Sequence, residues 1–174
     1  SKLIFPLLLS FLFFFSLCMI RHFTASAFVI DSKQRVLLLW HKKLMRWMPP
    51  GGHVDPNELP EETARRECKE ETGLDVVIIG DAQEDVFEQN RLEGRILKKP
   101  FCFLLEEIPA TPEQAAHQHM DFVYLARPTD DTQTLILEES EGTALRWFTL
   151  EEIQELPESD IFANVRGYIL EILQ

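Results

Sequence analysis

Three acidic residues with helical spacing are the clearest candidates for chemistry. Pro60 can begin a helix and Gly73 can end it, so the sequence predicts a helix over residues 60–72. On this helix Glu67, Glu70 and Glu71 stand at i, i+3 and i+4, which places their carboxylates on one face. Three such carboxylates repel one another and raise each other's pKa. A divalent cation that prefers hard oxygen ligands, Mg²⁺ or Mn²⁺, would remove this penalty.

The alternative is an ordinary solvated helix face. Arg65, Arg66 and Lys69 lie on the same helix and could pair with the glutamates, and charge runs are usually exposed to solvent. Against this, Ala64 and Cys68 form an adjoining apolar strip that we expect to pack into the core. From these residues alone, a metal site and a solvated face both remain open.

The elements that must position this helix form one mixed α/β domain. Apolar runs and turn residues predict strands over residues 23–30, 35–40, 74–79, 101–107, 119–127 and 144–148. A loop is expected from His41 to Asn57, directly before the acidic helix. Thr149 and Glu152 form a capping box that begins a short helix, and an apolar stripe predicts a final helix after Pro157.

The segment from Gly52 to Leu74 resembles the Nudix box. That motif reads Gly, five residues, Glu, seven residues, Arg-Glu, an aliphatic residue, any residue, Glu-Glu, any residue, Gly and an aliphatic residue. Every fixed place is filled, by Gly52, Glu58, Arg66, Glu67, Glu70, Glu71 and Gly73. Cys68 departs from an aliphatic residue, but a buried thiol behaves as a small hydrophobe. With its flanking context, the resemblance covers about residues 22–173.

The resemblance implies a Nudix-like α/β/α sandwich (α+β), with a mixed β-sheet and a loop–helix–loop catalytic motif. It also implies a metal-dependent pyrophosphohydrolase that cleaves a nucleoside diphosphate linked to another moiety by attack of water on phosphorus. Arg66 would orient the glutamates, and Glu58 would support the loop or a second metal shell. The implied metal ligands are Glu67, Glu70, Glu71 and the Gly51 carbonyl.

The general base is left open at this point. A glutamate on the metal-binding face can take the proton from the attacking water, which makes the box glutamates, Glu67 and Glu70 among them, candidates. A residue on a later loop is another, and Glu141 is the preferred one of three glutamates that precede the last strand. The alternative for that loop is a solvated acidic turn.

Four further residues are candidates for substrate binding. His119 and Asp121 alternate with His117 along one strand face, where they could form a second metal site, a substrate clamp or a structural strand edge. Lys43 and Arg46 precede Gly51, where cations could capture phosphate or simply end a basic hairpin.

The substrate follows only by elimination. By resemblance to Nudix subfamilies, a proline beyond the box suggests ADP-ribose and a tyrosine slightly further on suggests dinucleoside polyphosphates, and residues 89–92 contain neither. The additional motifs of NADH and coenzyme A pyrophosphatases are absent from the sequence as well. A nucleoside triphosphate or another small nucleotide derivative is therefore the default. The competing hypothesis is a non-catalytic Nudix-like module that binds or senses a nucleotide.

The amino-acid composition limits which binding partners and which cellular location are expected. The 174 residues carry 17 basic and 29 acidic side chains, a net charge of −12, and the excess lies after residue 102. No basic cluster is long enough to follow a nucleic-acid backbone, so a nucleic-acid polymer is not an expected partner. Three cysteines are too few for a disulfide framework and favour a reducing, cytoplasmic location. A homodimer is left open.

Residues 1–20 form a hydrophobic extension ahead of the domain expected over residues 21–174. From Leu3 to Ile20 the chain carries no charged side chain, which just reaches the length of a membrane span. We weigh a start-site extension outside the native fold, a membrane anchor, and a packed or oligomerising segment. An association with membranes is expected only if residues 3–20 are a native anchor.

Overall fold

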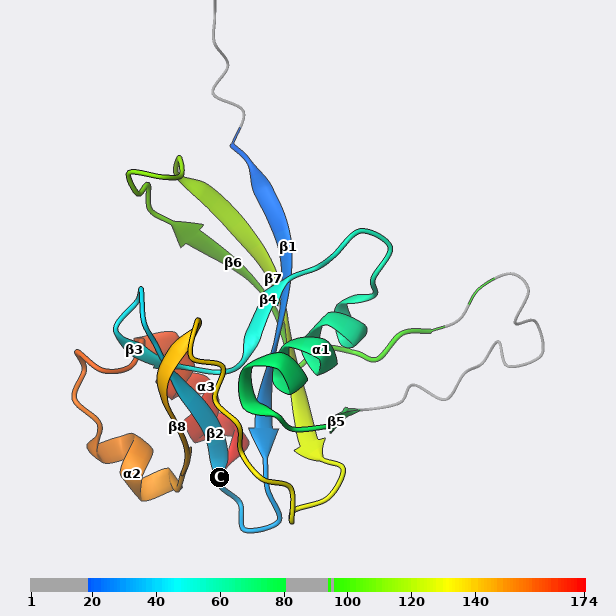
Figure 1. Ribbon diagram of the computed structural model, residues 1–174, viewed down its shortest axis with the longest axis vertical. Helices are drawn as coiled ribbons and strands as arrows, with labels where there is room; N and C mark the ends of the chain where they lie inside the picture. The colour runs from blue at the N-terminus through cyan, green and yellow to red at the C-terminus, as the bar shows by residue number, and fades with distance from the viewer. Residues whose placement is uncertain (1–18, 81–93, 95) are drawn as a thin grey trace, which may run out of the picture.

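A branched β-sheet organises the chain in the computed structural model, which describes residues 19–80, 94 and 96–174 (Figure 1). The first strands are β1 (Arg21–Ile30), β2 (Val36–His41), β3 (Arg46–Met48) and β4 (Gly51–His53). After helix α1 (Pro60–Thr72) come β5 (Val76–Ile79), β6 (Cys102–Ile108), β7 (His117–Pro128) and β8 (Gly142–Phe148). The chain ends with α2 (Leu150–Glu155) and α3 (Ala163–Ile172).

Strand β1 lies at the centre of this sheet. It pairs antiparallel with β2 and β4 and parallel with β7, so that His22 lies beside His119 and Thr24 beside Asp121. The remaining pairs of named strands are antiparallel, with β5 and β6 on β7 and with β3 and β8 on β2. The sheet is therefore mixed, as predicted.

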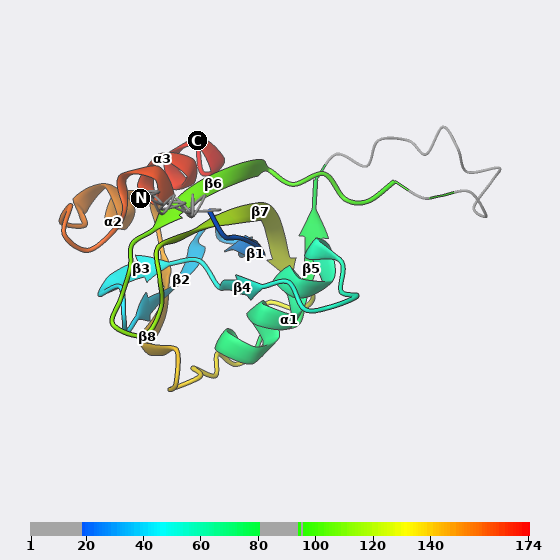
Figure 2. The same ribbon diagram turned by 90° about the horizontal axis from the view of Figure 1, so that it is seen from above.

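Helices cover both faces of the sheet, which gives an α/β/α sandwich and confirms the expected fold class (Figure 2). Alternation along β1 divides its side chains between the two layers. Ala25 and Ala27 face α1, where they share a core with Ala64 and Cys68. Phe28, with Leu38 of β2, faces a second core that α2 and α3 complete.

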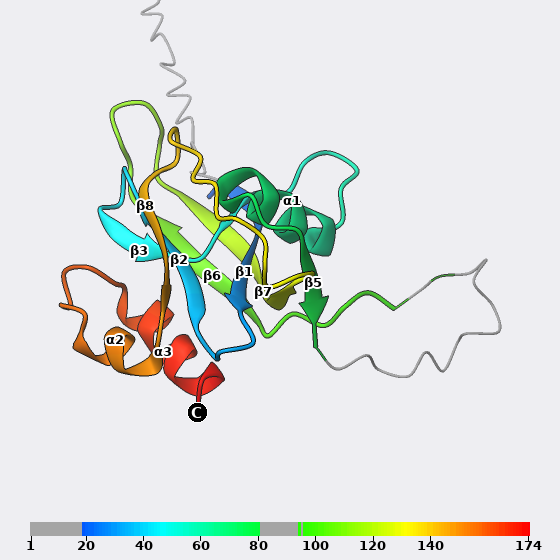
Figure 3. The ribbon, with the colours of Figure 1, turned by 60° about the horizontal axis from the view of Figure 1, so that its bottom comes forward.

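The predicted loop before α1 contains two short strands that the sequence did not indicate. β3 pairs with the end of β2, with Trp40 opposite Trp47, and β4 pairs with β1. Both strands are three residues long, and β4 begins with two glycines, so neither has the apolar alternation that predicts a strand. Figure 2 shows β4 between α1 and β1, where it becomes part of the site, and Figure 3 shows α2 and α3 on the side of the sheet away from α1.

Helix α1 begins and ends through local backbone bonds. Leu59 precedes it without a side-chain cap, as its apolar side chain requires, and the Glu62 carboxylate instead accepts the Leu59 N–H at 3.0 Å. Gly73 ends the helix in the left-handed conformation, with a φ of 76° that favours glycine, and donates its N–H to the Lys69 carbonyl. The predicted boundaries of this helix are confirmed.

The N-terminal hydrophobic run falls almost wholly outside the described part of the chain. Residues 1–18 are not described, so the anchor, extension and packing hypotheses stay predictions. Across residues 19–80, 94 and 96–174, the structure contains no helix with the length and apolar character of a membrane span.

Truncation of a core residue on α3 should test the second core. Ile169 is fully buried, and we expect Ile169→Ala to lower the free energy of unfolding by about 2–5 kcal/mol, because it leaves a cavity among well-packed side chains. Urea denaturation followed by circular dichroism measures the change. Ile20→Ala is the matched control, since Ile20 is 55% exposed, and an equal loss in both variants would contradict this account of the core.

Candidate active site

The Arg66 guanidinium lies at the centre of the acidic face of α1. Its Nε donates to Glu58 Oε1 at 2.9 Å, and its Nη1 donates to Glu67 Oε1 at 2.6 Å and to Glu70 Oε2 at 3.0 Å. Its Nη2 donates to Glu58 Oε2 and to the His53 carbonyl. One cation therefore holds three carboxylates, and these contacts keep the arginine protonated by raising its pKa.

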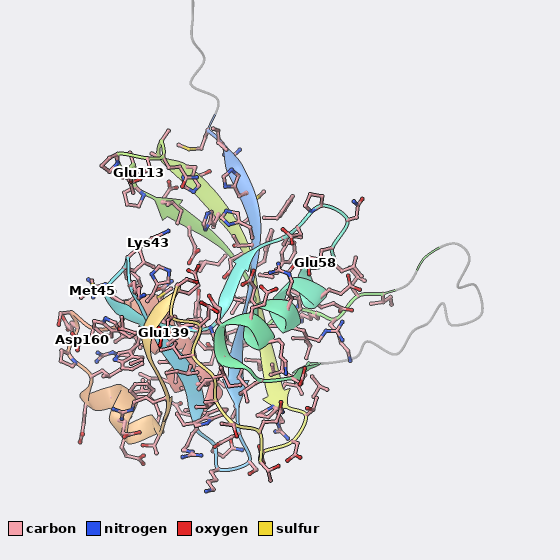
Figure 4. All side chains as sticks on the ribbon, in the orientation of Figure 1. Lys43, Met45, Glu58, Glu113, Glu139 and Asp160 are labelled. Carbon is pink, nitrogen blue, oxygen red and sulfur yellow. The ribbon has the colours of Figure 1, made fainter. Side chains whose placement is uncertain are left out.

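Glu58 anchors the loop that leads into α1 (Figure 4). Besides the two bonds from Arg66, its Oε2 accepts from the Thr63 hydroxyl at 2.7 Å and from the Asp55 N–H at 3.3 Å. Donation from Arg66 is the main reason that the pKa of Glu58 falls to about 2. This carboxylate is thus ionised and fully engaged, which suits a supporting role.

Glu71 points from α1 toward the start of β4. Its Oε2 accepts the Gly51 N–H at 3.0 Å, and the residue is only 6% exposed. Burial raises its pKa to about 8, with neighbouring glutamates adding to the shift and the Gly51 N–H opposing it. An ionised Glu71 in this place therefore calls for a cation.

Gly52 makes room for the carboxylate of Glu67. A Cβ added at Gly52 would lie 2.4 Å from Glu67 Oε1 and 2.6 Å from its Cδ, so only a glycine admits the carboxylate in this position. Burial raises the pKa of Glu67, and Arg66 opposes that shift. The glycine of β4 and the glutamate of α1 are thus fitted to each other.

The donor set suits a hard divalent cation. Glu67, Glu70 and Glu71 bring carboxylate oxygens to one helix face, and β4 brings backbone at Gly51 and Gly52 against two of them. Two of the carboxylates are buried strongly enough to disfavour their charge, which is the penalty that a bound cation would remove. Oxygen ligands of this kind fit Mg²⁺ or Mn²⁺.

The loop before β8 brings Glu141 to the site. Its charge contributes to the raised pKa of Glu71, and its carbonyl accepts the Lys42 N–H. The preceding Glu138 donates its N–H to the Glu71 carbonyl at 3.1 Å, which fastens this loop to the end of α1. Glu141 therefore lies near the box, and its role as a base stays a prediction.

The two cations at the β2–β3 hairpin, Lys43 in its turn and Arg46 at the start of β3, have different surroundings. Arg46 donates to the carbonyls of Glu158 and Ser159 and lies over the Phe162 ring, so it ties β3 to the segment before α3. Lys43 is exposed at the tip of the turn, and Figure 4 shows it across from the β6–β7 connection at Glu113. Phosphate binding by either residue stays a prediction.

Asp121 and His119 lie on the sheet face opposite α1. Asp121 is 7% exposed and accepts from the Thr24 hydroxyl at 3.0 Å and from the Ser26 hydroxyl at 2.7 Å, so it joins β7 to β1. His119 lies beside His22 of the neighbouring strand, and burial is the main reason that its pKa falls to about 4. Substrate binding by His119 and Asp121 stays a prediction.

The sequence analysis did not identify the residues of β1 that lie next to His119 and Asp121. His22, Thr24 and Ser26 form a polar alternation within the otherwise apolar β1, and that pattern was the available signal. It indicates a polar strip on one face of the strand, but it does not identify β7 as the partner.

Comparison with known proteins decides the family. A family model described as the NUDIX domain matches residues 20–166. The chain belongs to the Nudix hydrolase family.

Solved structures and relatives agree with this Nudix assignment. A NUDIX-family hydrolase from Clostridium perfringens is 34% identical, with a TM-score of 0.74 over 88% of this chain and 96% of that one. A Bacillus subtilis protein, named as a candidate 8-oxo-dGTP diphosphatase, is 40% identical over 74 residues, 40% of this chain and 50% of the relative. The asymmetrical bis(5'-nucleosyl)-tetraphosphatase of Mus musculus is 32% identical over 110 residues, 63% of this chain and 60% of the relative. The alignments thus span between half and two thirds of these two relatives.

Loss of the Glu58 charge should change how stability depends on pH. The pKa of Glu58 lies below its ordinary value of 4.5, so its ionised form stabilises the fold above pH 4.5, and this contribution is lost as the pH falls toward 2. We expect Glu58→Gln to lower the free energy of unfolding by about 1–2 kcal/mol at pH 7. The difference from wild type should shrink below pH 4. Urea titrations in EDTA measure it, with Glu155→Gln on α2 as control, and a pH-independent difference would contradict the assignment.

Adding a methyl group at Gly52 should displace Glu67 without unfolding the protein. The new Cβ meets the end of a flexible side chain, so we expect Gly52→Ala to keep its fold and lose most of the stabilisation that Mg²⁺ gives to wild type. Thermal melts with and without Mg²⁺ measure this. Gly167→Ala is the matched control, because its Cβ would meet nothing within 4 Å. An unchanged response to Mg²⁺ in Gly52→Ala would show that the position of Glu67 does not matter for the metal.

Proposed function

We propose that this protein is a metal-dependent pyrophosphohydrolase that cleaves a small nucleotide by attack of water on phosphorus. The observation that carries the proposal is the carboxylate cluster on α1, in which Arg66 holds Glu58, Glu67 and Glu70 while the Gly51 N–H holds Glu71. All of the box glutamates are present. A module that only binds a nucleotide would not need every one of them, so the complete set favours catalysis.

The residues that would hold the metal are Glu67, Glu70, Glu71 and the Gly51 carbonyl. When bound, Mg²⁺ or Mn²⁺ supplies Lewis-acid chemistry and neutralises the charge of the phosphate oxygens. Arg66 orients the carboxylates and limits their repulsion, and Glu58 in turn orients Arg66. The Gly51 N–H fixes the direction of Glu71.

Glu70 is the best placed of the box carboxylates to take a proton from water. Its side chain is 56% exposed, whereas the Glu67 side chain is 14% exposed and Glu71 is buried. A general base must reach the attacking water directly or through one further water. We therefore assign the proton transfer to Glu70 and keep Glu141, whose charge reaches Glu71, as the residue to compare with it.

The substrate class that we propose is a nucleoside triphosphate. The Bacillus subtilis relative is named for a purine nucleoside triphosphate, and the mouse relative is named for a dinucleoside polyphosphate. Both names describe nucleotides with a chain of phosphates, and both compounds therefore belong in the first assay. The cations at the β2–β3 hairpin, Lys43 and Arg46, are the proposed contacts for such a phosphate chain.

A hydrolysis screen tests this function. Nucleoside triphosphates, 8-oxo-dGTP, diadenosine tetraphosphate, nucleotide sugars and ADP-ribose are incubated with Mg²⁺, and the released phosphates are measured. We expect turnover of one class, and a fall in kcat of about 10²-fold or more in Glu70→Gln. Glu141→Gln is assayed in parallel to compare the two acids, and Glu61→Gln, on the first turn of α1, is the control.

Two results would overturn the proposal. If no compound is hydrolysed while a nucleotide raises the melting temperature, the protein is a nucleotide-binding module, because a ligand that binds only the folded state stabilises it. If hydrolysis proceeds equally in Glu70→Gln and without divalent metal, the carboxylate cluster is not the catalytic site.

A further inference from the structure

Four of the five histidines lie together at one end of the sheet, outside the carboxylate cluster. His22 comes from β1, His53 from β4, and His117 and His119 from β7. Side chains alternate between the two faces of a strand, so His22 lies on the same face of β1 as Phe28 and on the opposite face from Ala25. Phe28 faces the α2–α3 layer, and Ala25 faces α1. The histidine cluster, defined as these four residues, therefore lies on the sheet face away from α1.

The ring nitrogens are spaced as metal ligands are. His117 Nε2 and His119 Nε2 are 3.2 Å apart, and His22 Nδ1 and His53 Nε2 are also 3.2 Å apart. One nitrogen from each of His22, His117 and His119 lies within 4.8 Å of the other two. Two nitrogens bound to one zinc ion at about 2.0–2.1 Å with tetrahedral angles are separated by about 3.3–3.4 Å. His117 and His119 already have nearly that separation, whereas the His22 nitrogen, within 4.8 Å of both, has to move closer to them.

An oxygen acceptor lies on the far side of each histidine ring on β7. His117 Nδ1 lies 2.9 Å from the Ala115 carbonyl, so this nitrogen carries the proton and the lone pair falls on Nε2, toward His119. His119 Nδ1 lies on the side of Glu106, 4.0 Å from its Oε2, while its Nε2 faces His117. A carbonyl or carboxylate on the far nitrogen is the usual support of a histidine that binds metal.

The same spacing argues against a clamp for phosphate. An anion is held best by protonated imidazoles, but rings whose nitrogens are 3.2 Å apart repel one another when both carry a charge. Neutral imidazoles with converging lone pairs bind a cation instead. Imidazole nitrogen suits zinc, copper, nickel and iron, whereas Mg²⁺ selects oxygen.

We propose that His22, His117 and His119 form a binding site for Zn²⁺, with His53 beside it. Three histidines leave one position of a tetrahedral ion open, and the exposed ring of His53 lies next to that of His119. The site differs from the carboxylate cluster in ligand type and in the sheet face on which it lies. The histidine cluster thus binds Zn²⁺, and the carboxylate cluster on α1 binds Mg²⁺ or Mn²⁺.

Zinc retention in the presence of magnesium tests this site. Protein without a polyhistidine tag is dialysed against Zn²⁺ in a large excess of Mg²⁺, and bound zinc is measured by elemental analysis. We expect one zinc ion per chain, and binding at least about 100-fold weaker in His119→Gln and in His22→Gln, because each removes a direct ligand. The matched control is His41→Gln at the end of β2, which removes the fifth histidine and should retain zinc.

A second readout separates the site from the proposed catalysis and from failures of folding. Wild-type protein loaded with Co²⁺ should show the intense visible absorption of a four-coordinate ion, and Glu70→Gln should show it unchanged. The proposal is overturned if wild type retains no zinc, if Mg²⁺ displaces it, or if both cluster variants retain as much as His41→Gln. Circular dichroism of each variant confirms that a loss of zinc is not a loss of fold.

Discussion

A single guanidinium between three carboxylates is the interaction on which the acidic face of α1 depends. Arg66 donates to Glu58, Glu67 and Glu70, and through Glu58 it also fixes the loop that carries the polypeptide from β4 into α1. Removing one partner of such a network leaves uncompensated charge at a partly buried place. One positive charge among four box glutamates still leaves the face strongly negative. Arg66 therefore does not neutralise this face of the helix.

Strand β4 connects this face with the rest of the sheet because its residues point to opposite sides. Gly52 faces α1 and receives the Glu67 carboxylate, whereas Gly51 lies against Ser26, where an added Cβ would be 2.5 Å from the serine Cβ. The carbonyl of the next residue, His53, accepts a hydrogen bond from Arg66, and its ring belongs to the histidine cluster. Three consecutive residues of β4 thus contact the carboxylate cluster, strand β1 and the other histidines.

The sequence predicted what depends on local spacing and missed what depends on distant pairing. Glu67, Glu70 and Glu71 share a face because helical geometry alone places them there, and the ends of α1 follow from Pro60 and Gly73. The three-residue strands around the Gly-Gly pair are fixed by β1 and β2, not by their own pattern. The histidine cluster forms only because β1 and β7 pair in parallel, and nothing local in either strand indicates that partner.

The parallel pairing of β1 with β7 also has a consequence for how the protein folds. Thr24 and Asp121, which bond across this pair, are 97 residues apart in the chain. Contacts of such long sequence separation form slowly, because a large loop must close before they are made. During synthesis, α1 and its glutamates leave the ribosome well before β7 does. Until β7 arrives, the edge of β1 that pairs with it is open, and an unpaired strand edge is prone to aggregation.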